Sequence, residues 1–181
     1  MSGGFRPVFR RALPADTPQY SAAAERFFRQ TYGYDAGHAA VMDRHCAKTF
    51  APGVIRTQLG NPKVSTLIAT QDETIVALAQ MLAKDGAGEV QRFYVDAAWH
   101  GLGIAQTMMG SLISTAEAAG LEALHLGVWS RNDRAIAFYL RQGFRPEGTV
   151  EFLLAGIPQS DLLMRRPLAR GAGTPGTGAN V

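Results

Sequence analysis

The sequence has few cysteines, few histidines and no long run of charge of one sign. One cysteine, Cys46, excludes an internal disulfide framework and a cysteine-rich zinc site, and its helical surroundings favour a small core residue. Of the four histidines, His38 and His45 have no partner at a metal-ligand spacing, so we assign no metal. The net charge of +3 comes from scattered arginines and lysines, which gives no indication of nucleic-acid binding.

Long hydrophobic runs are also absent. No stretch of about 18 apolar residues occurs, and the N-terminal segment lacks the hydrophobic region of a signal peptide. We therefore expect no membrane association and a cytoplasmic protein. With 181 residues, 46% hydrophobic and 18% charged, the chain is suited to one globular domain. We expect a flexible leader over 1–6, a domain over 7–167 and a disordered, glycine-rich tail over 168–181.

The first half of the chain changes from helical to extended periodicity. Helical spacing of apolar residues predicts helices, and later alternation with a period of two predicts strands joined by short turns, which makes them antiparallel neighbours. The expected elements are a strand over 7–13, helices over 18–32 and 36–50, a short helical turn over 54–59, and strands over 64–70, 74–83 and 89–96.

The second half predicts a crossover. A helix from Ile104 ends at Gly120, and the strand that follows it must lie parallel to the 89–96 strand because a helix connects the two. The remaining expected elements are a strand over 122–128, a helix over 133–142, and strands over 149–154 and 161–164 separated by residues 156–158. The fold class is therefore α/β: a mixed, mostly antiparallel seven-stranded sheet with one parallel strand–helix–strand crossover and helices on both faces.

A glycine-bearing turn joins the central strand to the helix that begins at Ile104. Gly101 and Gly103 can take backbone conformations closed to other residues, and the helix end that follows offers unpaired N–H groups and a positive dipole. Such a turn is a typical anion site, most often for phosphate. A P-loop is excluded because no Gly-Lys-Ser/Thr occurs, and the dinucleotide pattern G-x-G-x-x-G fails at Gln106.

Two segments resemble the GNAT superfamily of N-acetyltransferases. The run YVDAAWHGLGIA, from Tyr94 to Ala105, resembles its acyl-CoA-binding segment: Gly103 and Ala105 match the pattern [Gln/Arg]-x-x-Gly-x-[Gly/Ala], whereas His100 replaces the usual Gln or Arg. The run VWSRNDRAIAFY from Val128, followed by Gly-Phe at 143–144, resembles a second segment in the order and place that the family has it. The resemblance covers about residues 66–167.

This resemblance implies an acetyl-CoA-dependent N-acetyltransferase that passes the acetyl group directly to a primary amine. The coenzyme would lie between the central strand and the strand over 122–128, with its pyrophosphate on the glycine turn and its pantetheine arm paired with the backbone of Phe93 and Val95. An N–H near Tyr94 or Val95 would stabilise the oxyanion. The implied coenzyme-binding residues are Phe93, Tyr94, Val95, His100, Gly101, Leu102, Gly103, Ile104, Ala105, Asn132, Ala135 and Tyr139.

The resemblance also suggests catalytic residues. Tyr139 would be the general acid for the departing thiolate; its alternative role is packing in a helix stripe with Ile136 and Leu140. Glu89 is the leading candidate for the general base, against the alternative of a solvated strand end. Asn132 either caps its helix alone or also touches the coenzyme.

The acceptor is less defined. Tyr32, Tyr34, Asp35 and Trp129 supply aromatic and acidic groups suited to a cationic amine, and the layout is similar to polyamine-type acetyltransferases. We expect a small amine or polyamine, with a protein N-terminus or an amino acid as the alternative. Two other classes stay open: a non-catalytic acyl-CoA sensor, and a nucleotide-binding oxidoreductase that binds NAD. Members of the family often form homodimers.

Overall fold

The protein forms one seven-stranded sheet with helices on both faces. The structure is a computed structural model that describes residues 6–32, 39–154 and 157–169. The strand order is β1-β2-β3-β4-β5-β7-β6. The strands are β1 (Val8–Arg11), β2 (Val64–Gln71), β3 (Thr74–Lys84), β4 (Ala87–Val95), β5 (Ala123–Trp129), β6 (Arg145–Leu154) and β7 (Ile157–Pro167). The helices are α1 (Thr17–Tyr32), α2 (Ala39–Thr49), α3 (Pro52–Gly60), α4 (Ile104–Ala118) and α5 (Asp133–Arg141).

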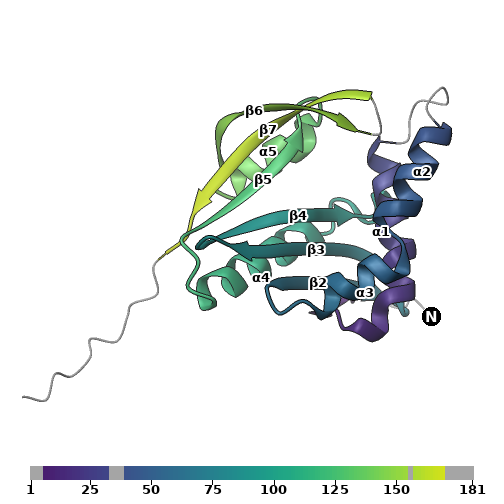
Figure 1. The fold of residues 1–181 in the computed structure, drawn as a ribbon. Coiled ribbons are helices and arrows are strands. Elements are labelled where there is room, and N and C mark those ends of the chain that lie inside the picture. The colour runs from purple at the N-terminus through teal and green to yellow at the C-terminus, as the bar shows by residue number, and fades with distance from the viewer. Residues whose placement is uncertain (1–5, 33–38, 155–156, 170–181) are drawn as a thin grey trace, which may run out of the picture.

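The parallel pair at the centre of the sheet divides it into two halves. Strands β1 to β4 are antiparallel neighbours, as are β5, β7 and β6. Strand β4 runs parallel to β5 but pairs with it only from Ala87 to Glu89. Beyond that point the two strands diverge, and Figure 1 shows them meeting at one end and separating toward α1. The expected mixed sheet with one parallel crossover is confirmed.

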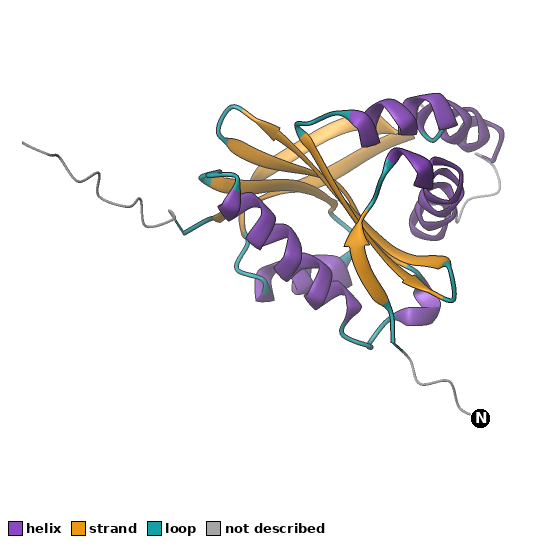
Figure 2. Ribbon diagram, turned by 90° about the horizontal axis from the view of Figure 1, so that it is seen from below, coloured by secondary structure: helices purple, strands orange, loops and turns teal. Residues whose placement is uncertain are grey.

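Helices lie on both faces of the sheet (Figure 2), and each face has its own apolar core. On one face α4 and α5 bury Met108, Leu112 and Phe144 against the sheet. On the other face α1, α2 and α3 bury Phe27 and Ile55 with their neighbours. Strand β3 is buried on both faces, which accounts for its nearly continuous apolar sequence.

Several elements are longer than the sequence predicts. The expected helical turn over 54–59 is a complete helix, α3, which begins with Pro52 at a position that favours proline. Strands β6 and β7 begin four residues before the expected 149 and 161, because they pair with each other from Arg145–Arg165 to Leu154–Ile157. This pairing also places Ile157 and Pro158 within β7, so the expected break over 156–158 is wrong at these two positions.

The domain boundary also differs at its C-terminal end. Leu168, which the sequence assigns to the tail, is 8% exposed in the core, and its N–H donates to the carbonyl oxygen of Glu122 at 3.0 Å. Residues 170–181 of the expected tail, residues 1–5 of the leader, and Tyr34 and Asp35 lie outside the described residues. In the described part of the chain, no helix combines the length and the hydropathy that a membrane span needs.

Candidate functional site

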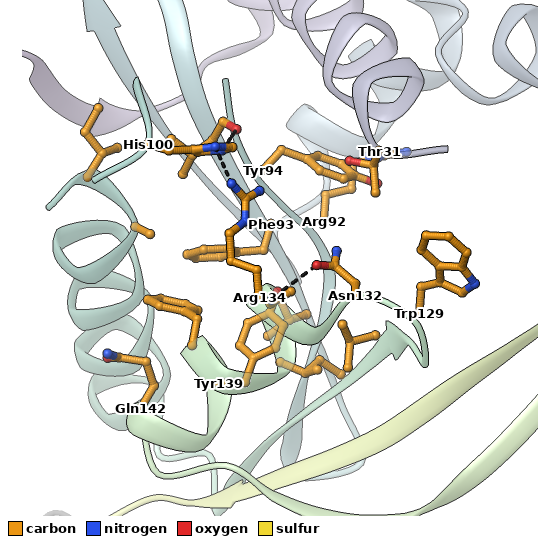
Figure 3. Close-up of a pocket in the computed structure, with 18 of the residues that line it drawn as sticks. Thr31, Arg92, Phe93, Tyr94, His100, Trp129, Asn132, Arg134, Tyr139 and Gln142 are labelled. Carbon is orange, nitrogen blue, oxygen red and sulfur yellow. Dashed lines mark hydrogen bonds between the residues drawn. The ribbon is translucent and has the colours of Figure 1, made fainter. Parts of the chain in front are cut away.

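A cleft of about 720 Å³ lies where β4 and β5 separate. Its walls come from both halves of the sheet, from the turn before α4, from α5 and from the last turn of α1. Residues of the expected coenzyme and acceptor sites that line it are Tyr32, Phe93, Tyr94, Val95, His100, Gly101, Gly103, Ile104, Ala105, Trp129, Asn132, Ala135 and Tyr139. Figure 3 draws lining residues around this space and labels ten of them. The structure therefore brings most of the expected site into one cavity.

The edge of β4 presents backbone groups to the cleft. A β-bulge at Gln91 interrupts its pairing with β3, since Val90 and Arg92 pair with consecutive residues of β3. Farther along, the N–H of Asp96 donates to Val76 on β3 at 2.9 Å. Because backbone groups alternate along a strand, the N–H groups of Val95 and Phe93 point the other way, into the cleft, whereas that of Tyr94 points to β3.

The glycine turn ends in an open helix terminus. Gly101 and Gly103 have φ angles of 81° and 78°, which strongly favour glycine at both positions. Gly103 is the N-cap of α4 and, without a side chain, makes no capping bond to the helix. The first N–H groups of α4, from Ile104 to Gln106, lie along the cleft, and helix N-termini of this kind bind anions. Leu102 is 50% exposed and is absent from the cleft lining.

His100 links the two walls of the cleft. Its Nε2 lies 2.9 Å from the carbonyl oxygen of Val95, so this nitrogen carries the proton and donates. The other ring nitrogen, Nδ1, then accepts from Nη1 of Arg134 on α5. Figure 3 shows Arg134 reaching across to His100 from the α5 side. His100, in place of the usual Gln or Arg, therefore holds the guanidinium of Arg134 beside the glycine turn. The sequence analysis gave no reason to select Arg134.

The start of α5 is fixed by a side-chain cap. Asn132 Oδ1 accepts from the N–H of Ala135 at 3.1 Å while the residue also lines the cleft, so capping and lining go together. One helical turn later Tyr139 is 7% exposed, and its ring packs edge-on against Phe93 and Phe144 at centroid distances of 6.1 and 5.7 Å. Burial raises the pKa of the Tyr139 phenol, with a smaller contribution from Tyr94, so the hydroxyl stays protonated at neutral pH.

The opposite end of the cleft is aromatic. The rings of Tyr32 at the end of α1 and Trp129 at the end of β5 lie 6.1 Å apart between centroids. Tyr94 is on the same face of the sheet, and burial raises the pKa of its phenol. Tyr32 and Trp129, two of the expected acceptor residues, are therefore neighbours, whereas Tyr34 and Asp35 lie outside the described residues.

Two carboxylates differ from the sequence-based picture. Glu89 is exposed on β4 at the point where β4 and β5 part, and it is absent from the cleft lining. Asp161 on β7, which the sequence analysis did not select, lines the cleft. Its pleat position opposite Trp129 depends on the register of β5 against β7, and a single sequence contains no signal for that register.

Other titratable residues lie outside the cleft. Cys46 is 1% exposed in the core, where burial raises the pKa of its thiol, in agreement with the expected core role. His45 stacks on Phe28 at 5.1 Å between ring centroids. Over residues 6–32, 39–154 and 157–169, no cluster of three or more His, Cys, Asp or Glu residues could hold a metal ion.

Comparisons with known proteins agree with this architecture. The model of the acetyltransferase (GNAT) family matches residues 38–144. An N-acetyltransferase of Mycobacterium bovis is 33% identical over 111 residues, which is 61% of this chain and 71% of the relative. The PaiA N-acetyltransferase of Thermoplasma acidophilum, solved with coenzyme A, superposes with a TM-score of 0.75 at 16% identity, over 90% of this chain and 99% of that one. The ribosomal-protein-S18-alanine N-acetyltransferase of Escherichia coli gives 0.71 at 16% identity, over 93% and 99%.

Proposed function

Because the chain belongs to the GNAT family and is an N-acetyltransferase that uses acetyl-CoA, we propose that it acetylates the primary amine of a small, cationic molecule. The observation that carries the proposal is the cleft between β4 and β5, which has an anion-binding turn at one end and aromatic walls at the other. A polyanionic donor and a cationic acceptor suit these two ends.

The donor fits the cleft at its phosphate end. The N–H groups that follow Gly103 would hold the pyrophosphate, and Arg134, fixed by His100, would add a charged contact. The N–H groups of Phe93 and Val95 face the cleft and would pair with the amides of the pantetheine arm. The carbonyl of Val95 already accepts from His100, so its N–H is the group left for the arm or for the thioester oxygen. Asn132 and Ala135 would line the opposite wall.

Acetyl-CoA supplies an activated acetyl group, and the protein supplies position, a polarised carbonyl and proton transfer. The N–H of Val95 faces the cleft, so it is the candidate donor to the carbonyl oxygen as negative charge develops. Tyr139 lies in the same cleft with a protonated hydroxyl, and it would give its proton to the departing thiolate.

The amine must lose a proton before it can attack, since an alkyl amine is mostly protonated at pH 7. Glu89 remains a proposed base. Because its side chain is absent from the cleft lining, it would act through water.

Thiol release tests the proposed function. The protein is incubated with acetyl-CoA and a panel of alkyl mono-, di- and polyamines, amino acids, and peptides with free N-termini, and free CoA thiol is measured. We expect turnover with small alkyl amines and little with peptides. Turnover confined to peptides would indicate that the acceptor is a protein N-terminus. Turnover confined to amino acids would indicate that the acceptor is an amino acid. No turnover with any amine would contradict the proposal.

A further inference from the structure

We propose that Asp161 binds the ammonium group of the acceptor and takes its proton. The inference rests on the proposed function and specifies how its acceptor is recognised. Among the described residues that line the cleft, Asp161 is the single carboxylate, whereas the cationic side chains there are Arg92, Arg134 and Arg141.

The placement of Asp161 follows from the register of β7. Asp161 is paired with Trp129 of β5, so the two side chains share one face of the sheet. Its chain neighbour Leu162 packs into the core on the α4 and α5 side, and alternation therefore directs Asp161 to the α1 side. Tyr32 and Tyr94 pack on that same side. The carboxylate thus belongs to the aromatic end of the cleft.

A glycine makes room for the carboxylate to lean across β5. A Cβ atom on Gly127 would lie 3.0 Å from Oδ2 of Asp161, which is closer than ordinary van der Waals contact. The side chain of Asp161 therefore lies over β5 at Gly127, and both residues line the cleft.

One oxygen of this carboxylate is left without a partner. Oδ1 of Asp161 is shielded from solvent and accepts no hydrogen bond within the described part of the chain. The other such side-chain atoms are the Tyr20 hydroxyl oxygen and Arg166 Nε, and neither residue lines the cleft. A buried oxygen without a donor is costly, and a ligand ammonium would supply the missing hydrogen bond and a compensating charge.

Nearby charges do not already satisfy Asp161. The guanidinium of Arg92 donates to the side chains of Gln58 and Gln80, so it is engaged on the α3 side of β4. Glu147, by contrast, lies 3.7 Å from both Arg165 and His125. Burial raises the pKa of the Asp161 carboxyl, which makes it a stronger proton acceptor than an exposed aspartate.

The proton balance is simple. The ammonium R–NH₃⁺ gives one proton to the Asp161 carboxylate, and the free amine forms a C–N bond to the acetyl carbon while the C–S bond breaks. The thiolate gains a proton from Tyr139, and the second proton that the nitrogen loses as the amide forms restores the Tyr139 hydroxyl. Asp161 returns its proton to solvent.

The variant Asp161→Asn tests the proposal when it is assayed with two amines that differ in charge. Benzylamine is protonated at pH 7 and needs the carboxylate, whereas O-benzylhydroxylamine is neutral and does not. We expect Asp161→Asn to lower kcat/KM for the alkyl amine by about 100-fold or more and for the neutral amine by less than about fivefold, with unchanged acetyl-CoA binding by calorimetry. If benzylamine is not a substrate, the best alkyl amine of the panel replaces it.

Three further variants complete the design. Gly127→Ala should displace the carboxylate and give a loss of about tenfold for the alkyl amine. Glu151→Gln, an exposed carboxylate on β6, is the control and should change nothing. Glu89→Gln tests the other proposed base: a larger loss there than in Asp161→Asn overturns the proposal.

The outcomes separate the two levels of inference. Equal losses for both amines, or no loss, overturn the role of Asp161 while leaving the acetyltransferase activity intact. If the wild-type protein acetylates neutral amines but no alkyl amine, that result also overturns the role of Asp161. A wild-type protein that releases no thiol with any amine removes the proposed function and this inference with it.

Discussion

The two ends of the cleft are built in different ways. The phosphate end is made of backbone: the turn through Gly101 and Gly103 and the first N–H groups of α4, all from one continuous segment. The acceptor end is made of side chains from α1, β4, β5 and β7, among them Tyr32, Trp129 and Asp161. Under the proposed function, a local turn that the sequence encodes would bind the donor, and a tertiary arrangement of side chains would bind the acceptor. Variants at the phosphate end should therefore affect acetyl-CoA binding, and variants at the acceptor end should affect the reaction with the amine.

Apart from the loss expected for Asp161→Asn, the largest effect is expected between the two ends of the cleft, at Tyr139. Tyr139→Phe removes the hydroxyl proposed as the proton donor and keeps the ring contacts with Phe93 and Phe144. We expect kcat to fall about 100-fold, with the acetyl-CoA dissociation constant and the melting temperature unchanged. Steady-state kinetics and calorimetry measure these quantities. Equal changes in kcat and in acetyl-CoA affinity would mean that Tyr139 shapes the pocket and does not act in the reaction.

The next largest effect is expected at the phosphate end of the cleft, in the glycine turn. Gly103→Val forces a β-branched residue into a φ of 78°, which costs about 1–3 kcal/mol and displaces the N–H groups of the turn. We expect the acetyl-CoA dissociation constant to rise about 10- to 100-fold.

Gly110 supplies the matched control for this variant within α4. A Cβ there would meet no atom within 4 Å, so Gly110→Ala should stabilise the fold by about 1 kcal/mol and leave acetyl-CoA binding unchanged. Tight binding by Gly103→Val would show that the turn is not the phosphate site.

A smaller effect is expected from the cation at the same end. Arg134→Ala removes the guanidinium that bonds to His100, and we expect acetyl-CoA to bind about 3- to 10-fold more weakly. The loss should shrink as ionic strength rises, because exposed charges are screened. Arg131→Ala is the control, since Arg131 is exposed nearby and absent from the cleft lining. A similar loss in both variants would point to general charge attraction.

The smallest effect concerns stability at the acceptor end. Burial raises the folded-state pKa of Asp161, so the charged form destabilises the fold at pH values above the ordinary range of an aspartate. Asp161→Asn should raise the melting temperature by roughly 2 °C at pH 7 to 8. The difference should vanish below about pH 4, where the wild-type carboxyl is protonated in both states. A lower melting temperature at pH 7 would indicate a structural role for the charge.

The contrast between the two ends also explains what a single sequence can predict. Local patterns sufficed for the strand, glycine turn and helix around Gly101 and Gly103, because turn conformation and helix start depend on neighbouring residues. The crossover helix also predicted the parallel direction of β5 against β4, which the structure confirms.

The acceptor end depends on information that is not local. Asp161 reaches the cleft because β5 pairs with β7 in one register and because Gly127 lacks a side chain. The greater length of β7 also depends on pairing between distant residues. Its pairing with β6 stabilises residues such as Pro158 that disfavour a strand by themselves. Arg134 was visible in the sequence, but its contact with His100 joins two elements 34 positions apart.

The most direct test of the account measures donor and acceptor binding in the same two variants. Acetyl-CoA affinity and the kcat/KM for an alkyl amine are determined for Gly103→Val, Asp161→Asn and the double variant. The account predicts that Gly103→Val weakens acetyl-CoA binding, that Asp161→Asn leaves it unchanged but lowers kcat/KM for the alkyl amine, and that the double variant shows the product of the two kcat/KM losses. Loss of acetyl-CoA affinity in Asp161→Asn, equal to that in Gly103→Val, would contradict the division of the cleft into a donor end and an acceptor end.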